Sequence, residues 1–193
     1  SLNANQLDTL SSGYEEYLNV DGVTKNDLFW FHYDKKQLEE SGIKGIWLNY
    51  YYKEYSQYGN ALFSKQNGLK WRTEFDPKSI GTYKPYSQLD SDATQVNQTL
   101  KYLKFGFGQC MDHVCYDMRE NRLSRKDAIK LVLELDGLCS EIYIKNFCDY
   151  IDIDIDTFWT TAEKFRGKMW NKENDQWKNS VSEELRKQLD YED

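Results

Sequence analysis

The stretch KYLKFGFGQCMDHVCYDMRENRLSRKDAIK, residues 101–130, decides the fold. Apolar side chains at steps of three and four residues run into it from Val96, which is the spacing of one helix face. Gly106 and Gly108 interrupt that series, because glycine weakens a helix and tolerates turn conformations. A second helix is predicted to begin near Gln109. Two helices therefore meet at a double-glycine break.

Capping signals extend the helical pattern along the chain. Ser124 and Asp127 form an S-x-x-D capping box, which predicts a helix that ends at Gly137. Residues 1–44 are predicted to be a loop-rich segment and residues 45–193 a helical domain. The fold class is all-α, an irregular bundle of about six to eight helices, with room for one short strand near residues 45–48. The other helices are expected over residues 34–41, 46–68, 92–105 and 141–150, from Asp154 onward, and from residue 171 to the tail.

Composition excludes several classes of protein. The 193 residues carry a formal net charge of -7, and 16% of them are aromatic. Disordered chains are poor in aromatic residues, and general nucleic-acid binders carry a basic footprint. The net negative charge therefore argues against a nucleic-acid partner. No apolar run approaches the roughly 20 residues of a membrane span, so no span is expected. The absence of Met at position 1 suggests an excised or processed piece of a longer protein.

Metal sites are not expected. Cys110, His113 and Cys115 lie close in sequence, but a structural zinc site needs four ligands at defined spacings. The aspartates of IDIDID, residues 151–156, suggest a calcium loop, yet Thr157 stands where such a loop needs glycine. Helix capping by Asp154 explains this segment better. With no CxxC pair, the four cysteines are expected to be reduced thiols in the cytoplasm.

Positive charge gathers locally in residues 101–130, which hold seven Lys and Arg against four acidic residues. Such a cluster beside a helix start suits a phosphate or an acidic sugar, through guanidinium groups and helix amides. An ordinary solvated helix face with paired charges explains the same pattern equally well. Asp112 and His113 are weak candidates for an acid–base pair.

The string YLKFGFGQCMDHVCYDMRENRLSRKDAIKLVLELDG resembles the C-terminal portion of the N-acetyl sugar amidotransferases, a family of PP-loop ATPase-type enzymes that act on lipopolysaccharide and nonulosonic-acid sugars. The resemblance covers about residues 45–170 and includes FWTTAEKFRG near its end. Gln109 and Asn121 depart from the family, which usually has Arg and Gly there. The matching positions are Tyr102, Lys104, Phe105, Gly106, Phe107, Gly108, Asp112, Arg119, Arg122, Ser124, Arg125, Ala128, Asp136 and Gly137.

This resemblance implies that the chain is the substrate-recognition part of an ATP-dependent enzyme that makes an amidino sugar. The SGGxDS loop that binds ATP does not occur in these residues, so the fragment alone is expected to be inactive and to bind no cofactor. ATP and Mg²⁺ are expected for the intact enzyme. The implied partners are an N-terminal ATPase half, a glutaminase subunit that supplies ammonia, and an anionic sugar. The implied anchors are Lys104, Arg119, Arg122 and Arg125.

A different class of function stays open beside the enzyme. A non-catalytic helical domain could dock a protein partner through a face rich in Tyr and Trp, because aromatic residues are enriched at interfaces. The candidate docking residues are Trp30, Trp47, Tyr51, Tyr55, Tyr58 and Trp71.

Overall fold

The computed structural model describes residues 24, 26–27, 35–46, 48, 51–52 and 55–190. The chain divides into two compact units, residues 1–56 and residues 57–193. The first unit contains helix α2 (Lys35–Ser41), which the sequence predicted. Most of the segment predicted to be loop-rich, including Asp34, lies outside the described residues.

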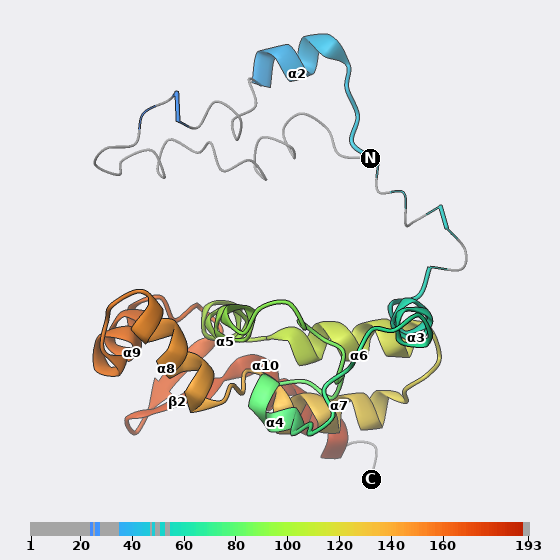
Figure 1. Cartoon of the computed structure of the whole chain (residues 1–193). Coiled ribbons are helices and arrows are strands. Elements are labelled where there is room, and N and C mark those ends of the chain that lie inside the picture. The colour runs from blue at the N-terminus through green and yellow to red at the C-terminus, as the bar shows by residue number, and fades with distance from the viewer. Residues whose placement is uncertain are drawn as a thin grey trace. The chain divides into compact units, whose positions relative to one another are not determined.

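Helices form most of the second unit, and the mainly-α fold class is confirmed. Within this unit α8 and α9 lie at one end, α6 and α7 lie toward the other, and α5 lies between them (Figure 1). The elements are α3 (Gln57–Gln66), α4 (Pro77–Ile80), α5 (Ala93–Phe105), α6 (Gln109–Arg119), α7 (Arg125–Leu135), α8 (Glu141–Tyr150), α9 (Ile155–Lys164), β1 (Trp170–Glu173), β2 (Gln176–Asn179) and α10 (Ser180–Asp190).

Two apolar clusters hold these helices together. One joins α6 to α7 through buried residues that include Cys110, Val114 and Val132. The other joins α5, α8 and α9 through Val96, Ile144, Cys148 and Phe158. Burial of such side chains is the main favourable term in folding, so these clusters fix the positions of the surface hollows described below.

The predicted caps are confirmed. Ser124 Oγ accepts a hydrogen bond from the Asp127 backbone N–H at 3.1 Å and starts α7. Asp154 accepts one from the Thr157 backbone N–H at 2.6 Å and starts α9. The carboxylate of Asp154 therefore satisfies a free amide of a helix start, as the capping interpretation required.

The helix predicted over residues 46–68 begins too early: α3 starts only at Gln57, and among the described residues before it, 51–52 and 55–56 are not helical. Tyr51 and Tyr55 are four positions apart, which is a helical spacing, but both are exposed, so this spacing does not correspond to a buried face. A helix in a protein gains most of its stability from packing an apolar face, and spacing alone does not supply that surface.

The helix predicted from residue 171 is also wrong at its start. Residues 170–179 form an antiparallel hairpin, in which Trp170 pairs with Asn179 and Glu173 with Gln176. Asn174 and Asp175 have φ values of 49° and 60°, the left-handed conformation of a two-residue hairpin turn. Helix α10 follows from Ser180. Near residues 45–48, Gly45 forms an isolated bridge.

None of the helices in the described part of the chain has the length and apolar character that crossing a membrane requires.

Candidate functional site

The first turn of α6 is occupied by a side chain of the protein itself. Asp136 is buried and accepts hydrogen bonds from the backbone N–H groups of Gly108 at 2.7 Å, Cys110 at 2.9 Å and Met111 at 3.3 Å. A Cβ on Gly108 would lie 2.9 Å from Asp136 Oδ1, which explains a glycine there. The amides that the sequence suggested for an external anion are therefore already satisfied.

A closed network of charges lies near the other end of α6. Asp117 accepts hydrogen bonds from Lys84 at 3.0 Å, from Arg122 at 2.6 Å and from the Tyr83 hydroxyl. Lys84 is only 2% exposed and also donates to Gln57 at 3.1 Å. Burial alone would raise the pKa of Asp117, but these donors outweigh it and lower that pKa. The network joins the 81–88 segment to α6 and α3.

Asp112 and His113 are neighbours in sequence but face different partners. Asp112 forms an ion pair with Lys101 and is partly exposed. His113 is buried, and its Nδ1 lies 2.6 Å from Thr82 Oγ1. Burial, together with the charge of Lys84, lowers the pKa of His113 to about 4. His113 is therefore neutral near pH 7 and is engaged inside the fold.

Gln109, where the family usually has Arg, is buried as well. Its Nε2 donates to the Ile80 carbonyl at 2.8 Å, and its Oε1 accepts from the Ser87 hydroxyl at 3.3 Å. In this chain the position holds the 80–87 segment against α6 and does not face a surface hollow. The departure from the family is thus accommodated by internal hydrogen bonds.

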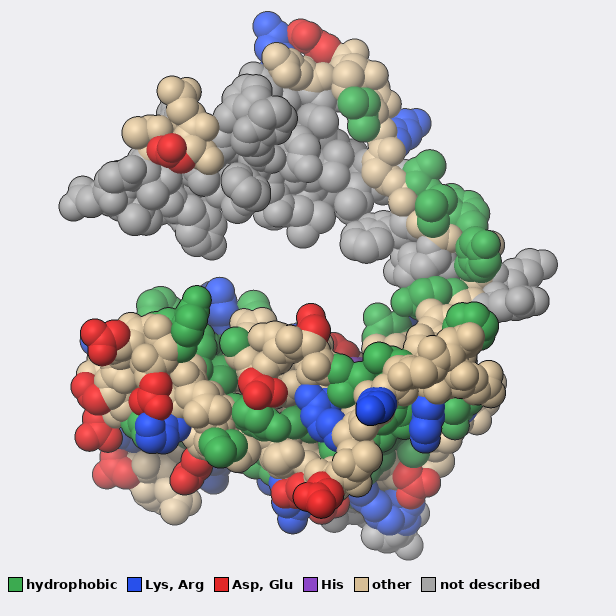
Figure 2. All heavy atoms as spheres, in the orientation of Figure 1, with side chains coloured by type: hydrophobic (Ala, Val, Ile, Leu, Met, Phe, Trp, Pro, Cys, Tyr) green, Lys and Arg blue, Asp and Glu red, His purple; other side chains and the backbone are tan. Residues whose placement is uncertain are grey.

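The four cations predicted to anchor a ligand do not share one hollow. Lys104 borders an apolar groove, Arg119 borders a hollow on α6, and Arg125 borders a third hollow and donates to Gln188 at 2.5 Å. Arg122 is bound to Asp117 and Glu120, and its guanidinium lies 5.0 Å from the centre of the Tyr58 ring. Figure 2 shows the blue side chains of the second unit scattered over the visible face.

One hollow does bring two of the predicted residues together. Asp112 and Arg119 both line a cavity of about 310 Å³, which we call the α6 hollow. The Arg119 guanidinium lies 5.1 Å from the centre of the Tyr116 ring, and the Lys101 ammonium lies 4.9 Å from the centre of the Phe107 ring. The lining of the hollow thus combines aromatic rings, a carboxylate and the Arg119 guanidinium, and Lys101 is paired with the lining residue Asp112. Its lining residues are Phe107, Met111, Asp112, Cys115, Tyr116, Arg119 and Val181.

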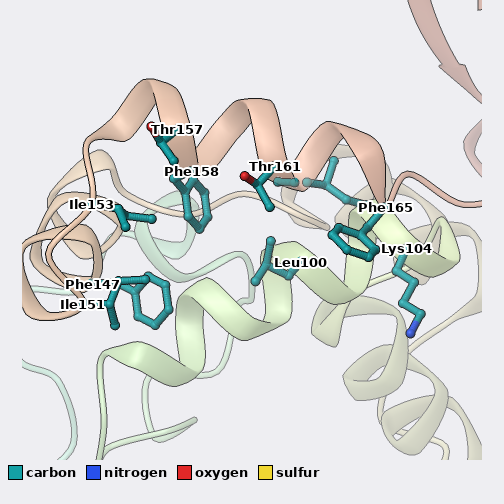
Figure 3. A pocket seen from close by; sticks show the side chains of 11 residues that line it. Leu100, Lys104, Phe147, Ile151, Ile153, Thr157, Phe158, Thr161 and Phe165 are labelled. Atoms are coloured by element: carbon teal, nitrogen blue, oxygen red, sulfur yellow. The ribbon is translucent and has the colours of Figure 1, made fainter. Parts of the chain in front are cut away.

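A larger and almost wholly apolar groove lies between α5 and α9, with a volume of about 550 Å³. In Figure 3, Ile153 and Phe147 mark one end of it, and Phe165 and Lys104 mark the other. Phe158 and Phe165 are seven positions apart, a spacing that places both on one side of a helix. Phe158 is indeed buried, but Phe165 is 68% exposed, and helical spacing cannot separate a core residue from a rim residue.

The sequence predicted no role for Lys84, and it singled out Asp136 only as a position that matches the family motif. Neither residue was expected to be buried in a network of internal hydrogen bonds. A lysine is rarely buried without a partner, so its burial could be inferred only once Asp117 was known to be near. The local sequence carries no such signal.

No group of three or more potential metal ligands occurs among the residues that the structure describes. All four cysteines are free thiols, and Cys110 and Cys148 are buried. Burial raises the pKa of the Cys110 thiol, so this residue behaves as a small apolar side chain rather than as a nucleophile.

The predicted aromatic docking residues divide between the two units. Trp30 and Trp47 lie outside the described residues. Tyr51 and Tyr55 belong to the first unit, with exposed fractions of 75% and 50%. In the second unit Tyr58 is 39% exposed, and Trp71 is half-buried against Tyr86, with ring centres 4.8 Å apart.

Comparison with known proteins identifies the greater part of the second unit. Residues 73–186, more than half of the chain, match the model of a family described as "LPS biosynthesis protein WbpG-like, C-terminal domain". No curated protein matches the chain. The matched range contains both apolar clusters, the α6 hollow and the α5–α9 groove.

Proposed function

The chain belongs to this family of WbpG-like C-terminal domains of lipopolysaccharide biosynthesis proteins, and on that premise we propose that it is the substrate-recognition part of an ATP-dependent N-acetyl sugar amidotransferase. The observation that carries the proposal is that Asp112 and Arg119, both at positions that resemble the amidotransferase motif, open onto the same α6 hollow. The substrate is an acidic N-acetyl sugar.

The chemistry of the hollow suits such a sugar. The rings of Phe107 and Tyr116 offer apolar surfaces to the C–H groups of a pyranose, and the Asp112 carboxylate can accept hydrogen bonds from its hydroxyl groups. Arg119 can bind a carboxylate or phosphate through two parallel N–H donors. A volume of about 310 Å³ is at the lower end of the range for ligand pockets, which corresponds to one sugar ring.

The reaction proposed for the intact enzyme runs in two steps. The acetamido oxygen attacks the α-phosphate of ATP, so that pyrophosphate leaves and an adenylate forms. Ammonia from a glutaminase subunit then adds to the activated carbon, and AMP leaves with the oxygen, which gives an amidine. ATP and Mg²⁺ would be held by an N-terminal ATPase half, and the reaction would take place in the cytoplasm. The role of this chain is to hold the sugar.

A binding titration tests this assignment. The chain is titrated with a 2-acetamido-2-deoxyhexuronic acid and with neutral N-acetylglucosamine, and heat is measured. We expect the acidic sugar to bind more tightly. Arg119→Gln is expected to lower the affinity for the acidic sugar about tenfold, because it removes a charge-assisted pair. Arg186→Gln, on an exposed residue of α10 that borders a different hollow, is the matched control. Equal affinity for both sugars, or an unchanged Arg119→Gln variant, would contradict the proposal.

The aromatic docking surface is the second candidate function. Tyr51 and Tyr55 expose 75% and 50% of their surface, and exposed tyrosines are suited to burial in an interface. If this surface binds the ATPase half, changing both residues to Ser should abolish co-purification of the two parts while sugar binding persists. Co-purification that survives the double change would rule out this surface.

A further inference from the structure

The α5–α9 groove is not used by the proposed sugar site. Its lining contains two threonines and one lysine, and the other lining residues are apolar: Leu100, Leu103, Phe147, Ile151, Ile153, Phe158, Ala162 and Phe165. A sugar or a nucleotide bound there would lose water from its hydroxyl groups and find few partners, which is unfavourable. The occupant must therefore be largely apolar.

The distance between α5 and α9 limits the shape of the molecule that can occupy the groove. The Cα atoms of α5 and α9 approach within 8 Å of one another, and both helices share the cluster that contains Phe158. An α-helix with its side chains is about 10–12 Å across, so a further helix could lie only on top of α5 and α9, whereas an extended chain enters the groove between their side chains. The volume of about 550 Å³ lies within the range of small-molecule sites. An extended aliphatic chain fits this space.

The two ends of the groove differ in charge. At the end marked by Phe165, Lys104 borders the groove, and the exposed Lys164 and Lys168 flank the Phe165–Gly167 segment. Gly167 N–H donates to the Leu103 carbonyl at 3.1 Å, so this segment lies against the end of α5.

The nearest acidic residue in the sequence at this end, Glu163, is paired with Arg166. The sequence from 164 to 170 contains three cations and no acidic residue. This end of the groove therefore carries a net positive charge.

The opposite end is acidic. Ile151 and Ile153, which line it, alternate with Asp152 and Asp154, and Asp156 follows in the first turn of α9. All three aspartates are exposed. Red side chains also gather at the α8–α9 end of the unit in Figure 2. An anionic head group would be repelled from this end and attracted to the lysine end.

From this polarity we propose that the α5–α9 groove binds an alkyl phosphate, with the aliphatic chain along Leu100 and Phe158 and the phosphate at Lys104, Lys164 and Lys168. The net positive charge at this end suits the dianion of a phosphate monoester better than the single charge of a carboxylate. Lys104 extends away from α9 in Figure 3, so its flexible four-carbon stem has to turn toward the head group on binding. Chain burial provides most of the affinity, because removing apolar surface from water is favourable, and the lysines fix the direction of binding.

The experiment uses dodecyl phosphate below its micelle concentration and measures binding by calorimetry. Thr161→Trp places a large ring in the groove, whereas Thr160→Trp, one residue away and outside the lining, is the matched control. We expect Thr161→Trp to weaken binding at least tenfold and Thr160→Trp to leave it within twofold. Changing Lys104, Lys164 and Lys168 together to Gln should lower the affinity for dodecyl phosphate at least tenfold and leave the affinity for dodecanol unchanged.

Each other outcome would overturn the proposal. These outcomes are undetectable binding of dodecyl phosphate, binding that Thr161→Trp does not change, and dodecanol or dodecanoate that binds as tightly as the phosphate. The titration of the acidic sugar is run on the same variants. It should be unchanged in all of them, because the groove does not share a lining residue with the α6 hollow. If the sugar does not bind at the α6 hollow, the result for dodecyl phosphate at the α5–α9 groove therefore still stands.

Discussion

Two regions of helix α6 contain the same types of charged residue, but these residues have different roles. Asp117 binds Lys84 and Arg122 and is 7% exposed, so this network is closed. Five residues earlier, Asp112 pairs with Lys101 on the edge of an open hollow that Arg119 also lines. A charged side chain becomes available for a ligand only where the fold leaves space beside it. The comparison separates charges that hold the structure from charges that can recognise a substrate.

The largest expected effect comes from the closed network. Asp117→Ala leaves Lys84 buried without its carboxylate, and breaking such a pair costs about 3–5 kcal/mol. Asp112→Ala, on the same helix, removes a partly exposed pair and should cost less than about 1 kcal/mol. Urea unfolding monitored by circular dichroism measures both. Similar losses in the two variants would show that the distinction between the regions is false.

A pH effect follows from His113, which lies between these two aspartates on the helix. Its pKa is about 4 in the folded chain against 6.5 for an ordinary histidine, so the unfolded chain binds the proton more readily. Stability should therefore fall as the pH decreases from 6.5 to 4, by about 3 kcal/mol from this residue.

The lowered pKa of Asp117 adds a loss at more acidic pH, so the two groups must be separated. His113→Gln should flatten the stability curve between pH 6.5 and 4, whatever its effect on absolute stability. A curve for the variant that runs parallel to the wild-type curve in that range would exclude His113 as the cause.

The smallest effect is expected for Arg125, one of the four cations that the sequence proposed as anchors. Its hydrogen bond to Gln188 is exposed, and it borders neither the α6 hollow nor the α5–α9 groove. Arg125→Ala should change the free energy of unfolding by less than about 0.5 kcal/mol. It should also leave the affinity for the acidic sugar within twofold. A tenfold loss of affinity would extend the recognition surface to α7.

Much of the fold could be predicted because its signals are local. The capping box at Ser124 and the cap at Asp154 depend on residues within one turn, and both helix starts are confirmed. The hairpin at residues 170–179 had a signal that was missed, since Asn174 and Asp175 are residues that tolerate its turn. Trp170 and Trp177 are seven positions apart, which is also a helical spacing, and this concealed the hairpin.

The arrangement of charges could not be predicted in the same way. Lys84 and Asp117 are 33 positions apart, and Gly108 and Asp136 are 28 apart. Only the packing of α6 on α7 and on the 81–88 segment brings them together. A count of Lys and Arg along residues 101–130 therefore identified a basic segment but could not show which cations have internal partners.

The most direct test of this account compares the same substitution at two arginines that are three positions apart. Arg119→Gln and Arg122→Gln are compared by urea unfolding and by titration with the acidic sugar. We predict that Arg122→Gln lowers stability by about 1–3 kcal/mol, because it removes a charged hydrogen bond to Asp117, and keeps sugar affinity within twofold. Arg119→Gln should leave the free energy of unfolding unchanged and lower the affinity for the acidic sugar about tenfold. The opposite pattern, with binding lost in Arg122→Gln and stability lost in Arg119→Gln, would contradict the account.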